Sequence, residues 1–212
     1  MNYTSIDFQL VIDIFLLLLI GIGPKIALVP FLDLTKAMDD ASKGRVSRKM
    51  LTTAGAVALI LTGLGELLSR LLHFSTGSLS IAGGIVLVII AINMVLGSET
   101  SERASKDTDP MRLAVFPLAV PYLLNPAGIV ALITLSSEAD SAAVFAVVLG
   151  VLAVVLALDV VVFRWANRVS EHLDASRMLV TEKVFGVLLS ALAVQLVLNG
   201  LDSVGVIELG SH

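Results

Sequence analysis

The chain alternates long apolar runs with short polar connections. Four runs contain no charged residue, and they extend from Phe74 to Ser98, from Leu113 to Ser137, from Ser141 to Leu158 and from Val184 to Leu201. Each approaches or exceeds the roughly 20 residues with which a helix crosses the hydrocarbon core of a bilayer. Two further stretches, about 8–35 and about 50–72, are interrupted by polar residues but are long enough. The pattern therefore predicts an all-α membrane protein with six transmembrane helices.

Composition agrees with this prediction. Hydrophobic residues make up 57% of the 212 residues, charged residues 15%, and the mean hydropathy is +0.96, which is far from the mixture of a soluble domain. The N-terminus carries Asp7 and Asp13 and no basic region, so we do not expect a cleaved signal peptide. Cysteine is absent, which excludes disulfides and thiolate chemistry. We expect no cofactor, no metal site and no nucleic-acid partner; the expected partners are the lipid bilayer and a small-molecule substrate, with a homo-oligomer left open.

The first apolar stretch is interrupted at its centre by Gly21, Gly23, Pro24 and Lys25. Pro24 lacks a backbone donor and clashes with the preceding turn, so a helix here must kink or split. In lipid a split helix is tolerated only where it faces protein or a water-filled cavity. A kinked packing helix is the alternative interpretation of a single Gly-Pro pair.

A second proline interrupts an apolar stretch 102 residues later. That offset carries Pro24 to Pro126, Gly84 to Gly186 and Asn93 to Gln195. With three spans in each half, the second half enters the membrane in the opposite direction, which is the inverted-repeat plan of many secondary transporters. We therefore predict two inverted three-helix repeats, with the first and fourth helices broken at Pro24 and Pro126. The predicted divisions are 1–97 for the first repeat, 98–111 for a charged cytoplasmic linker, 112–203 for the second repeat and 204–212 for a C-terminal tail, whose last residues Gly210-Ser211-His212 resemble the start of an expression tag.

The cations predict the orientation of the chain. Twelve of the 14 Lys and Arg residues lie in the first, third and fifth connections, Arg70 lies alone in the second, and Lys25 is within a span. By the positive-inside rule, both termini lie outside and the three basic connections face the cytoplasm. We expect the protein in the cell membrane, which is the inner or plasma membrane.

The two breaks are the candidate substrate site. Each proline suits the first turn of the half-helix that follows it, so two helix N-termini, each with unpaired donors and a positive dipole end, meet at mid-membrane. Such a place suits a carboxylate or another anionic group. The candidate substrate-binding residues are Gly23, Pro24, Lys25, Asn125, Pro126, Ala127, Asn93 and Gln195.

Intramembrane charges are functional candidates by default. Counted along the helices at about 1.5 Å per residue, Lys25 and Asp159 lie at similar depths and are predicted to pair, and Glu66 is a candidate for carrying a proton. A purely structural ion pair is the alternative for Lys25. Asn93 and Gln195 have an alternative role too, as side chains that hydrogen-bond one helix to another.

Four motifs in order resemble one known family. They are Phe31-Leu32-Asp33-Leu34-Thr35, Ile81-Ala82-Gly83-Gly84-Ile85, Pro117-Leu118-Ala119-Val120-Pro121, and Gly186 followed by Val194-Gln195 and Asn199-Gly200. In these the chain resembles the MarC family of six-span membrane proteins, over roughly residues 8 to 202. It departs from the family where D-P-x-G is common, with Gly23-Pro24-Lys25-Ile26, and where G-P-G is common, with Asn125-Pro126-Ala127. The resemblance implies transport of small neutral amino acids.

Two classes of function follow. The first is a secondary transporter in which the two halves rock around the Pro24 and Pro126 breaks. The second is a membrane protein that moves no amino acid: an intramembrane enzyme, an assembly factor, or an exporter of another small anionic or amphipathic compound. No predicted span contains His, and neither H-E-x-x-H nor G-x-S-x-G occurs, so we expect no enzyme and no catalytic residues.

Overall fold

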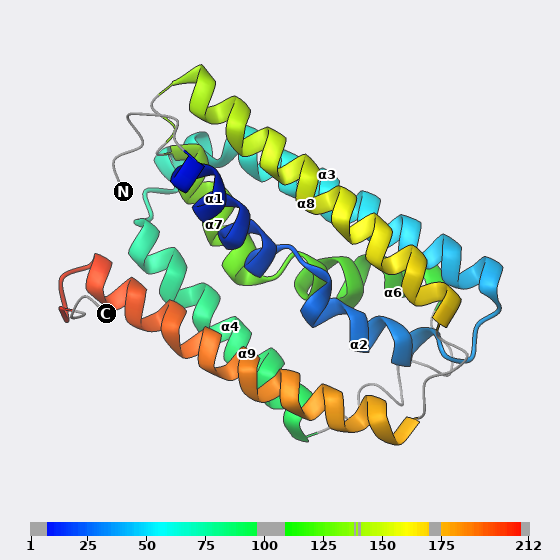
Figure 1. Cartoon of the computed structure of the whole chain (residues 1–212). Helices are drawn as coiled ribbons and strands as arrows, with labels where there is room; N and C mark the ends of the chain where they lie inside the picture. The colour runs from blue at the N-terminus through cyan, green and yellow to red at the C-terminus, as the bar shows by residue number, and fades with distance from the viewer. Residues whose placement is uncertain (1–7, 97–108, 138, 140, 170–174, 209–212) are drawn as a thin grey trace.

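The computed structural model describes residues 8–96, 109–137, 139, 141–169 and 175–208 as a bundle of helices (Figure 1). In chain order the elements are α1 (Phe8–Gly21), α2 (Pro24–Thr35), α3 (Asp40–Leu72), α4 (Thr76–Leu96), α6 (Pro110–Leu113), the π-helical segment η1 (Ala114–Leu123), α7 (Pro126–Ser137), α8 (Ala142–Val169) and α9 (Ala175–Ser203). Within this part of the chain the strand-like structure is one isolated antiparallel bridge between Ile22 and Leu124. The predicted all-α class is confirmed.

Long apolar helices and broken helices together make up the bundle. Among the described residues, four helices are long and apolar enough to cross a membrane alone, through Asp40–Leu71, Thr76–Leu96, Ala142–Ala166 and Lys183–Ser203. Shorter helices follow one another at the two breaks, where α1 ends at Gly21 before α2, and η1 ends at Leu123 before α7. The breaks predicted at Pro24 and Pro126 are therefore confirmed. Their arrangement as six spans in an inverted repeat stays a prediction.

Several helices extend beyond the apolar runs that predicted them. α3 begins at Asp40, about ten residues early, because the Asp39 side chain accepts a hydrogen bond from the Ser42 N–H at 3.3 Å. α6 begins at Pro110, inside the predicted linker, where the Asp109 side chain accepts from the Met111 N–H at 3.0 Å. The linker residues 98–108 lie outside the described residues. A helix can continue past the hydrocarbon core into the headgroup region, where a charged side chain costs little free energy.

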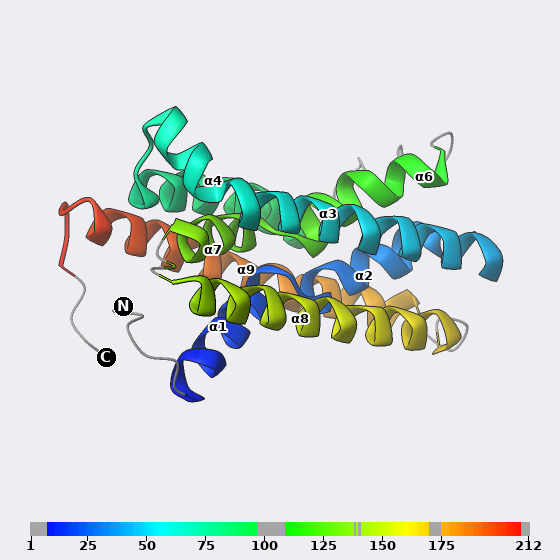
Figure 2. The same cartoon turned by 90° about the horizontal axis from the view of Figure 1, so that it is seen from above.

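Packing runs between the two halves of the chain rather than within them. α3 and α8 lie along one side of the bundle, α4 and α9 along the other, and the broken helices lie between these pairs (Figures 1 and 2). α3 packs on α7, η1 and α8; α1 packs on α7 and α8; α4 packs on α9 and α7. The two halves are thus interlocked by contacts between their helices, and the rocking of one half against the other stays a prediction.

Small residues form the contact between the antiparallel helices α4 and α9. An added Cβ at Gly77 would lie 2.9 Å from the Gly200 carbonyl oxygen, one at Gly84 would lie 2.8 Å from the Ala193 oxygen, and one at Gly186 would lie 3.2 Å from the Ala91 oxygen. Each helix thus places a small residue at the seam every seven positions. The backbones approach closely along the whole pair, as is typical of helices packed in lipid.

Two clusters of buried apolar side chains lie on either side of the breaks. The larger one joins α1, α2, α3, η1, α7 and α8, and includes the edge-to-face pair of Phe31 and Phe163, whose ring centroids are 5.2 Å apart. The smaller one joins α4 and α9 to Ile26 and Ala127, in the first turns of α2 and α7. The two half-helix starts therefore sit where the α4–α9 pair meets the rest of the bundle.

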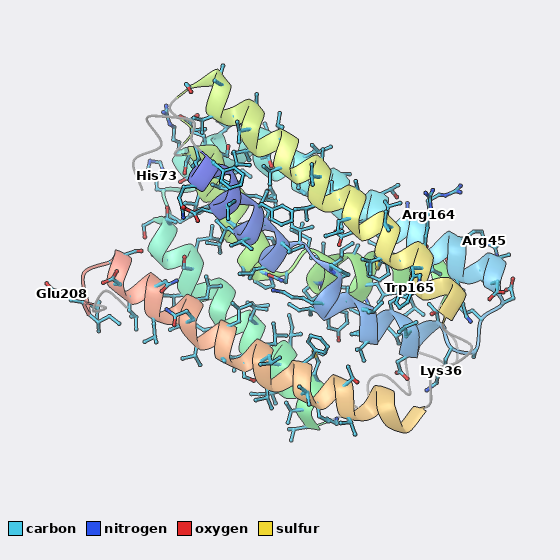
Figure 3. The ribbon with its side chains drawn as sticks, viewed as in Figure 1. Lys36, Arg45, His73, Arg164, Trp165 and Glu208 are labelled. Atoms are coloured by element: carbon cyan, nitrogen blue, oxygen red, sulfur yellow. The ribbon has the colours of Figure 1, made fainter. Side chains whose placement is uncertain are left out.

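Basic side chains gather at one end of the bundle. Figure 3 shows Lys36, Arg45 and Arg164 at one end, with His73 and Glu208 at the opposite end. The separation agrees with the alternation of basic connections along the sequence.

Candidate functional site

The two helix breaks meet in the middle of the bundle. Ile22 and Leu124 form an antiparallel bridge, and the Asn125 N–H donates to the Gly21 carbonyl oxygen at 3.0 Å. Segments more than 100 residues apart thus exchange backbone hydrogen bonds at the points where their own helices stop. This brings six of the eight predicted substrate-site residues, Gly23 to Lys25 and Asn125 to Ala127, into one region.

The place where the two breaks meet, which we call the crossing, depends on Gly21 and Gly128. The sequence interpretation did not assign these two glycines to the site. An added Cβ at Gly21 would lie 2.2 Å from the Gly128 Cα, and one at Gly128 would lie 2.3 Å from the Gly21 carbonyl oxygen. Real Cβ atoms do not come so close to backbone atoms, so both positions require glycine. The available signal was that each glycine lies two or three residues from a break proline.

Asn125 ties the second break to the first. Its side chain is 1% exposed; the amide nitrogen donates to the Ile20 carbonyl oxygen at 2.9 Å, and the amide oxygen accepts from the Gly128 N–H at 3.1 Å. The first contact satisfies a carbonyl at the end of α1, and the second caps the start of α7. Asn125 therefore has a structural role at the crossing, and its polar atoms are already occupied.

The start of α2, in contrast, has no such cap. Gly23 occupies the N-cap position in an extended conformation and contributes no side-chain hydrogen bond, and Pro24 fills the first helical position. An added Cβ at Gly23 would lie 2.3 Å from the Leu19 carbonyl oxygen, so a capping side chain does not fit there. The first N–H groups of α2 therefore have no partner within their own helix, beside the positive end of its dipole.

Lys25 and Asp159 do not pair in this structure. Lys25 is half-buried and makes no hydrogen bond or ion pair with any described residue, whereas Asp159 is fully buried with both carboxylate oxygens lacking a hydrogen-bond partner. The predicted pair rested on depth along the helices, which says nothing about the direction in which each side chain points. Asp159 instead lies on the buried stripe of α8, between Val155 and Phe163.

The remaining candidates lie away from the crossing. Glu66 is exposed and forms an ion pair with Arg70 on the same helix. Asn93 is exposed on α4, and Gln195 is exposed on α9, where its amide nitrogen donates to Asn199 at 2.7 Å. The structure therefore does not bring Asn93 or Gln195 to the breaks. In the described part of the chain, no group of three His, Asp or Glu residues is placed to hold a metal ion.

The segment η1 supplies a further feature that sequence reasoning passed over. Phe116 and Val120 have extended backbones, with φ and ψ of −136° and 125°, and of −134° and 123°, and each immediately precedes a proline. The clash between a proline ring and the preceding residue favours such a conformation. Pro117 and Pro121 also lack N–H groups, so each leaves a carbonyl of the preceding turn without its usual helical donor. η1 packs on α3, α2 and α6.

Long apolar helices around paired, broken helices define a multi-pass helical membrane protein. The chain belongs to the MarC family of integral membrane proteins, whose pattern it matches over residues 8–204. The resemblance seen in the four motifs is thereby confirmed.

Relatives extend from archaea to bacteria. A UPF0056 membrane protein of Methanocaldococcus jannaschii is 28% identical over 85% of this chain and 90% of its own length. The UPF0056 membrane protein YvbG of Bacillus subtilis is 25% identical over 92% of this chain and 95% of its own. YhcE of Escherichia coli, also a UPF0056 membrane protein, is 26% identical over 96% and 97%. No solved structure gives a significant match.

Proposed function

We propose that the protein is a secondary transporter that moves a small neutral amino acid by alternating access around the crossed breaks. One observation carries the proposal: the breaks meet through the Ile22–Leu124 bridge, while the first turn of α2 stays uncapped next to Lys25. Intramembrane backbone donors without helical partners are costly unless they face a cavity or a ligand. The family resemblance supports the choice of amino acid.

The start of α2 would hold the substrate carboxylate. Pro24 has no N–H, so the donors offered are those of Lys25 and the next two residues, and the helix dipole favours a negative group there. The Lys25 ammonium would add its charge or gate access to the site. The start of α7 is less available, because Asn125 already occupies the Gly128 N–H.

Backbone carbonyls of η1 would hold the substrate ammonium. At the extended residues Phe116 and Val120, η1 would offer backbone carbonyl oxygens of the kind that coordinate cations in transporters with unwound helices. A zwitterion bound between donors of α2 and acceptors of η1 has both charges matched without a charged pair of side chains. That arrangement suits a small neutral amino acid better than a simple anion.

The moving part would be the α4–α9 pair. It contacts the rest of the bundle chiefly through α7 and α2, the two helices that begin at the breaks. A change of backbone at either break would therefore tilt the pair and open one side of the site. In this proposal Asn93 and Gln195, which are exposed on the pair, meet the substrate on its way in or out, and Asp159 carries the coupling ion or proton.

We also propose the membrane location and the orientation of the protein. It lies in the cell membrane with six spans in an inverted repeat and both termini outside, since positive residues mark the cytoplasmic end. The protein catalyses no reaction. Movement of a solute across the membrane would distinguish this transporter from an assembly factor.

Transport into vesicles tests the proposal. The purified protein is reconstituted, and uptake of radiolabelled glycine, alanine and serine is compared with uptake of acetate, while the same solutes are tested for raising the melting temperature. Ala127→Leu fills the start of α7 beside Ile26, whereas Ala153→Leu places the same side chain on an exposed position of α8. We expect uptake of an amino acid in the wild type and Ala153→Leu, and none in Ala127→Leu. Failure of every solute to move or to stabilise the protein would refute the proposal, as would wild-type uptake by Ala127→Leu.

A further inference from the structure

Four exposed cations lie on the ends of α3 and α8 that meet at one end of the bundle, where Figure 3 labels Arg45 and Arg164. They are Arg45, Arg48 and Lys49 on α3, and Arg164 on α8, and all four side chains are exposed. We call them the basic patch. Its two helices run antiparallel (Figure 1), and the Leu156 side chain lies 3.4 Å from the position of a Cβ on Gly55. Arg164 comes eight residues after Leu156, and Ser47 comes eight residues before Gly55. Arg164 therefore lies level with Ser47, between Arg45 and Arg48.

Among the described residues, no carboxylate forms an ion pair with a cation of the basic patch. Within the described residues, the ion pairs are Lys36 with Asp33, Lys43 with Asp40, and Arg70 with Glu66. In the patch itself the one hydrogen bond is from the Arg45 guanidinium to the Ser42 hydroxyl at 2.8 Å. The Asp39 carboxylate is close enough to interact with the charge of Arg45. Arg48, Lys49 and Arg164 form no ion pair with a described residue, and three such cations favour an anionic partner.

The position of the basic patch relative to the membrane indicates which kind of anionic partner it meets. α3 has 33 residues and α8 has 28, and at about 1.5 Å per residue both exceed the roughly 30 Å of hydrocarbon, so these ends reach the lipid headgroups. Trp165, next to Arg164, is 62% exposed, and Val161 one turn away is 63% exposed. A tryptophan between an apolar stripe and a row of cations is typical of a membrane interface.

We propose that the basic patch binds the phosphate headgroups of anionic phospholipids in the leaflet at this end of the bundle. Three of its four cations are arginines, whose planar forks hold phosphate through paired hydrogen bonds. The patch spans α3 and α8, which belong to different halves of the chain, so a bound headgroup would hold the two helices together at their ends. This site is separate from the crossed breaks and does not depend on any transported solute.

The chain carries its own reporter for this site, because Trp165 is its single tryptophan. The protein is reconstituted in vesicles of phosphatidylglycerol and phosphatidylcholine in fixed proportion, with brominated acyl chains on either the anionic or the neutral lipid. Bromine quenches only tryptophan in close contact. A cation near the membrane surface favours an anionic lipid about fivefold, so brominated phosphatidylglycerol should quench Trp165 well beyond its share of the mixture.

Variants on α3 change the patch without touching the reporter helix. Arg45→Gln combined with Arg48→Gln should lower the excess quenching by brominated phosphatidylglycerol, because only Lys49 and Arg164 of the patch remain, and high salt should abolish the excess. Arg70→Gln, at the opposite end of α3, is the matched control and should leave the excess quenching unchanged. Equal quenching by both lipids in the wild type would overturn the proposal, and so would an excess that is undiminished in the double variant. Phosphatidylglycerol retained in native mass spectra of the wild type, and reduced in the double variant, gives a second measure.

Discussion

Removing the side chain of Asn125 tests whether the crossing of the breaks holds the bundle together. Asn125→Ala deletes the bonds to the part-buried Ile20 carbonyl and to the buried Gly128 N–H, and leaves both backbone groups without these partners. An unpaired buried group costs about 1–3 kcal/mol, so the two together predict a loss of about 2–6 kcal/mol in the free energy of unfolding. For a chain of this size, each kcal/mol lowers Tm by about 2–4 °C, so a fall of about 4 °C or more is expected.

A second substitution separates the two bonds. Asn125→Asp keeps an oxygen that can cap α7 through the Gly128 N–H, but it places a second oxygen against the Ile20 carbonyl and buries a charge. If the link to α1 matters as the structure indicates, Asn125→Asp is at least as unstable as Asn125→Ala. If only the cap matters, the aspartate variant matches the wild type.

Thermal unfolding of the purified protein in detergent, followed by circular dichroism, measures these differences. Asn199→Ala is the matched control, since Asn199 is exposed and its side chain accepts one described hydrogen bond, from Gln195 on the same helix. Its change should stay within about 0.5 kcal/mol. An Asn125→Ala variant as stable as Asn199→Ala would show that the breaks are not tied through this side chain.

Three further predictions concern other parts of the chain. Gly128→Ala should lower Tm and abolish amino-acid uptake, because its methyl group would meet the Gly21 carbonyl, while Gly150→Ala, whose Cβ meets nothing within 4 Å, should do neither. Lys25→Met and Asp159→Leu should change stability additively within about 0.5 kcal/mol, since the two side chains do not pair; a double-mutant cycle with a larger coupling would contradict this. Reporter fusions should place the C-terminus and the connection after Ser137 outside, and a cytoplasmic C-terminus would refute the orientation.

Local chemistry explains which parts of the fold could be predicted from the sequence. Apolar runs predicted the helices because lipid demands them, and Pro24 and Pro126 predicted the breaks because proline acts on its own helix. Helix ends such as Asp40 were missed because charged residues outside the lipid leave no apolar signal. The apolar run therefore marks the part of a helix that lies in lipid, not the whole helix.

Contacts between distant segments explain what could not be predicted. The role of Asn125 depends on Ile20, 105 residues away, and nothing near Asn125 in the sequence points to that carbonyl. The proposed pairing of Lys25 with Asp159 used the rise per residue, which fixes height but not the side of the helix. Asn93 and Gln195 were linked to the site by the 102-residue offset alone, and the structure places them on the exposed surface of the α4–α9 pair.

The interlocking of the two halves has a consequence for synthesis. When the ribosome has made α1 to α4, their main packing partners, which are η1, α7, α8 and α9, do not yet exist. The glycines of α4 that later meet α9 face lipid until almost the entire chain has been inserted. The first four helices must therefore remain in the bilayer as independent segments, and assembly of the bundle is completed only after the last helix leaves the translocon.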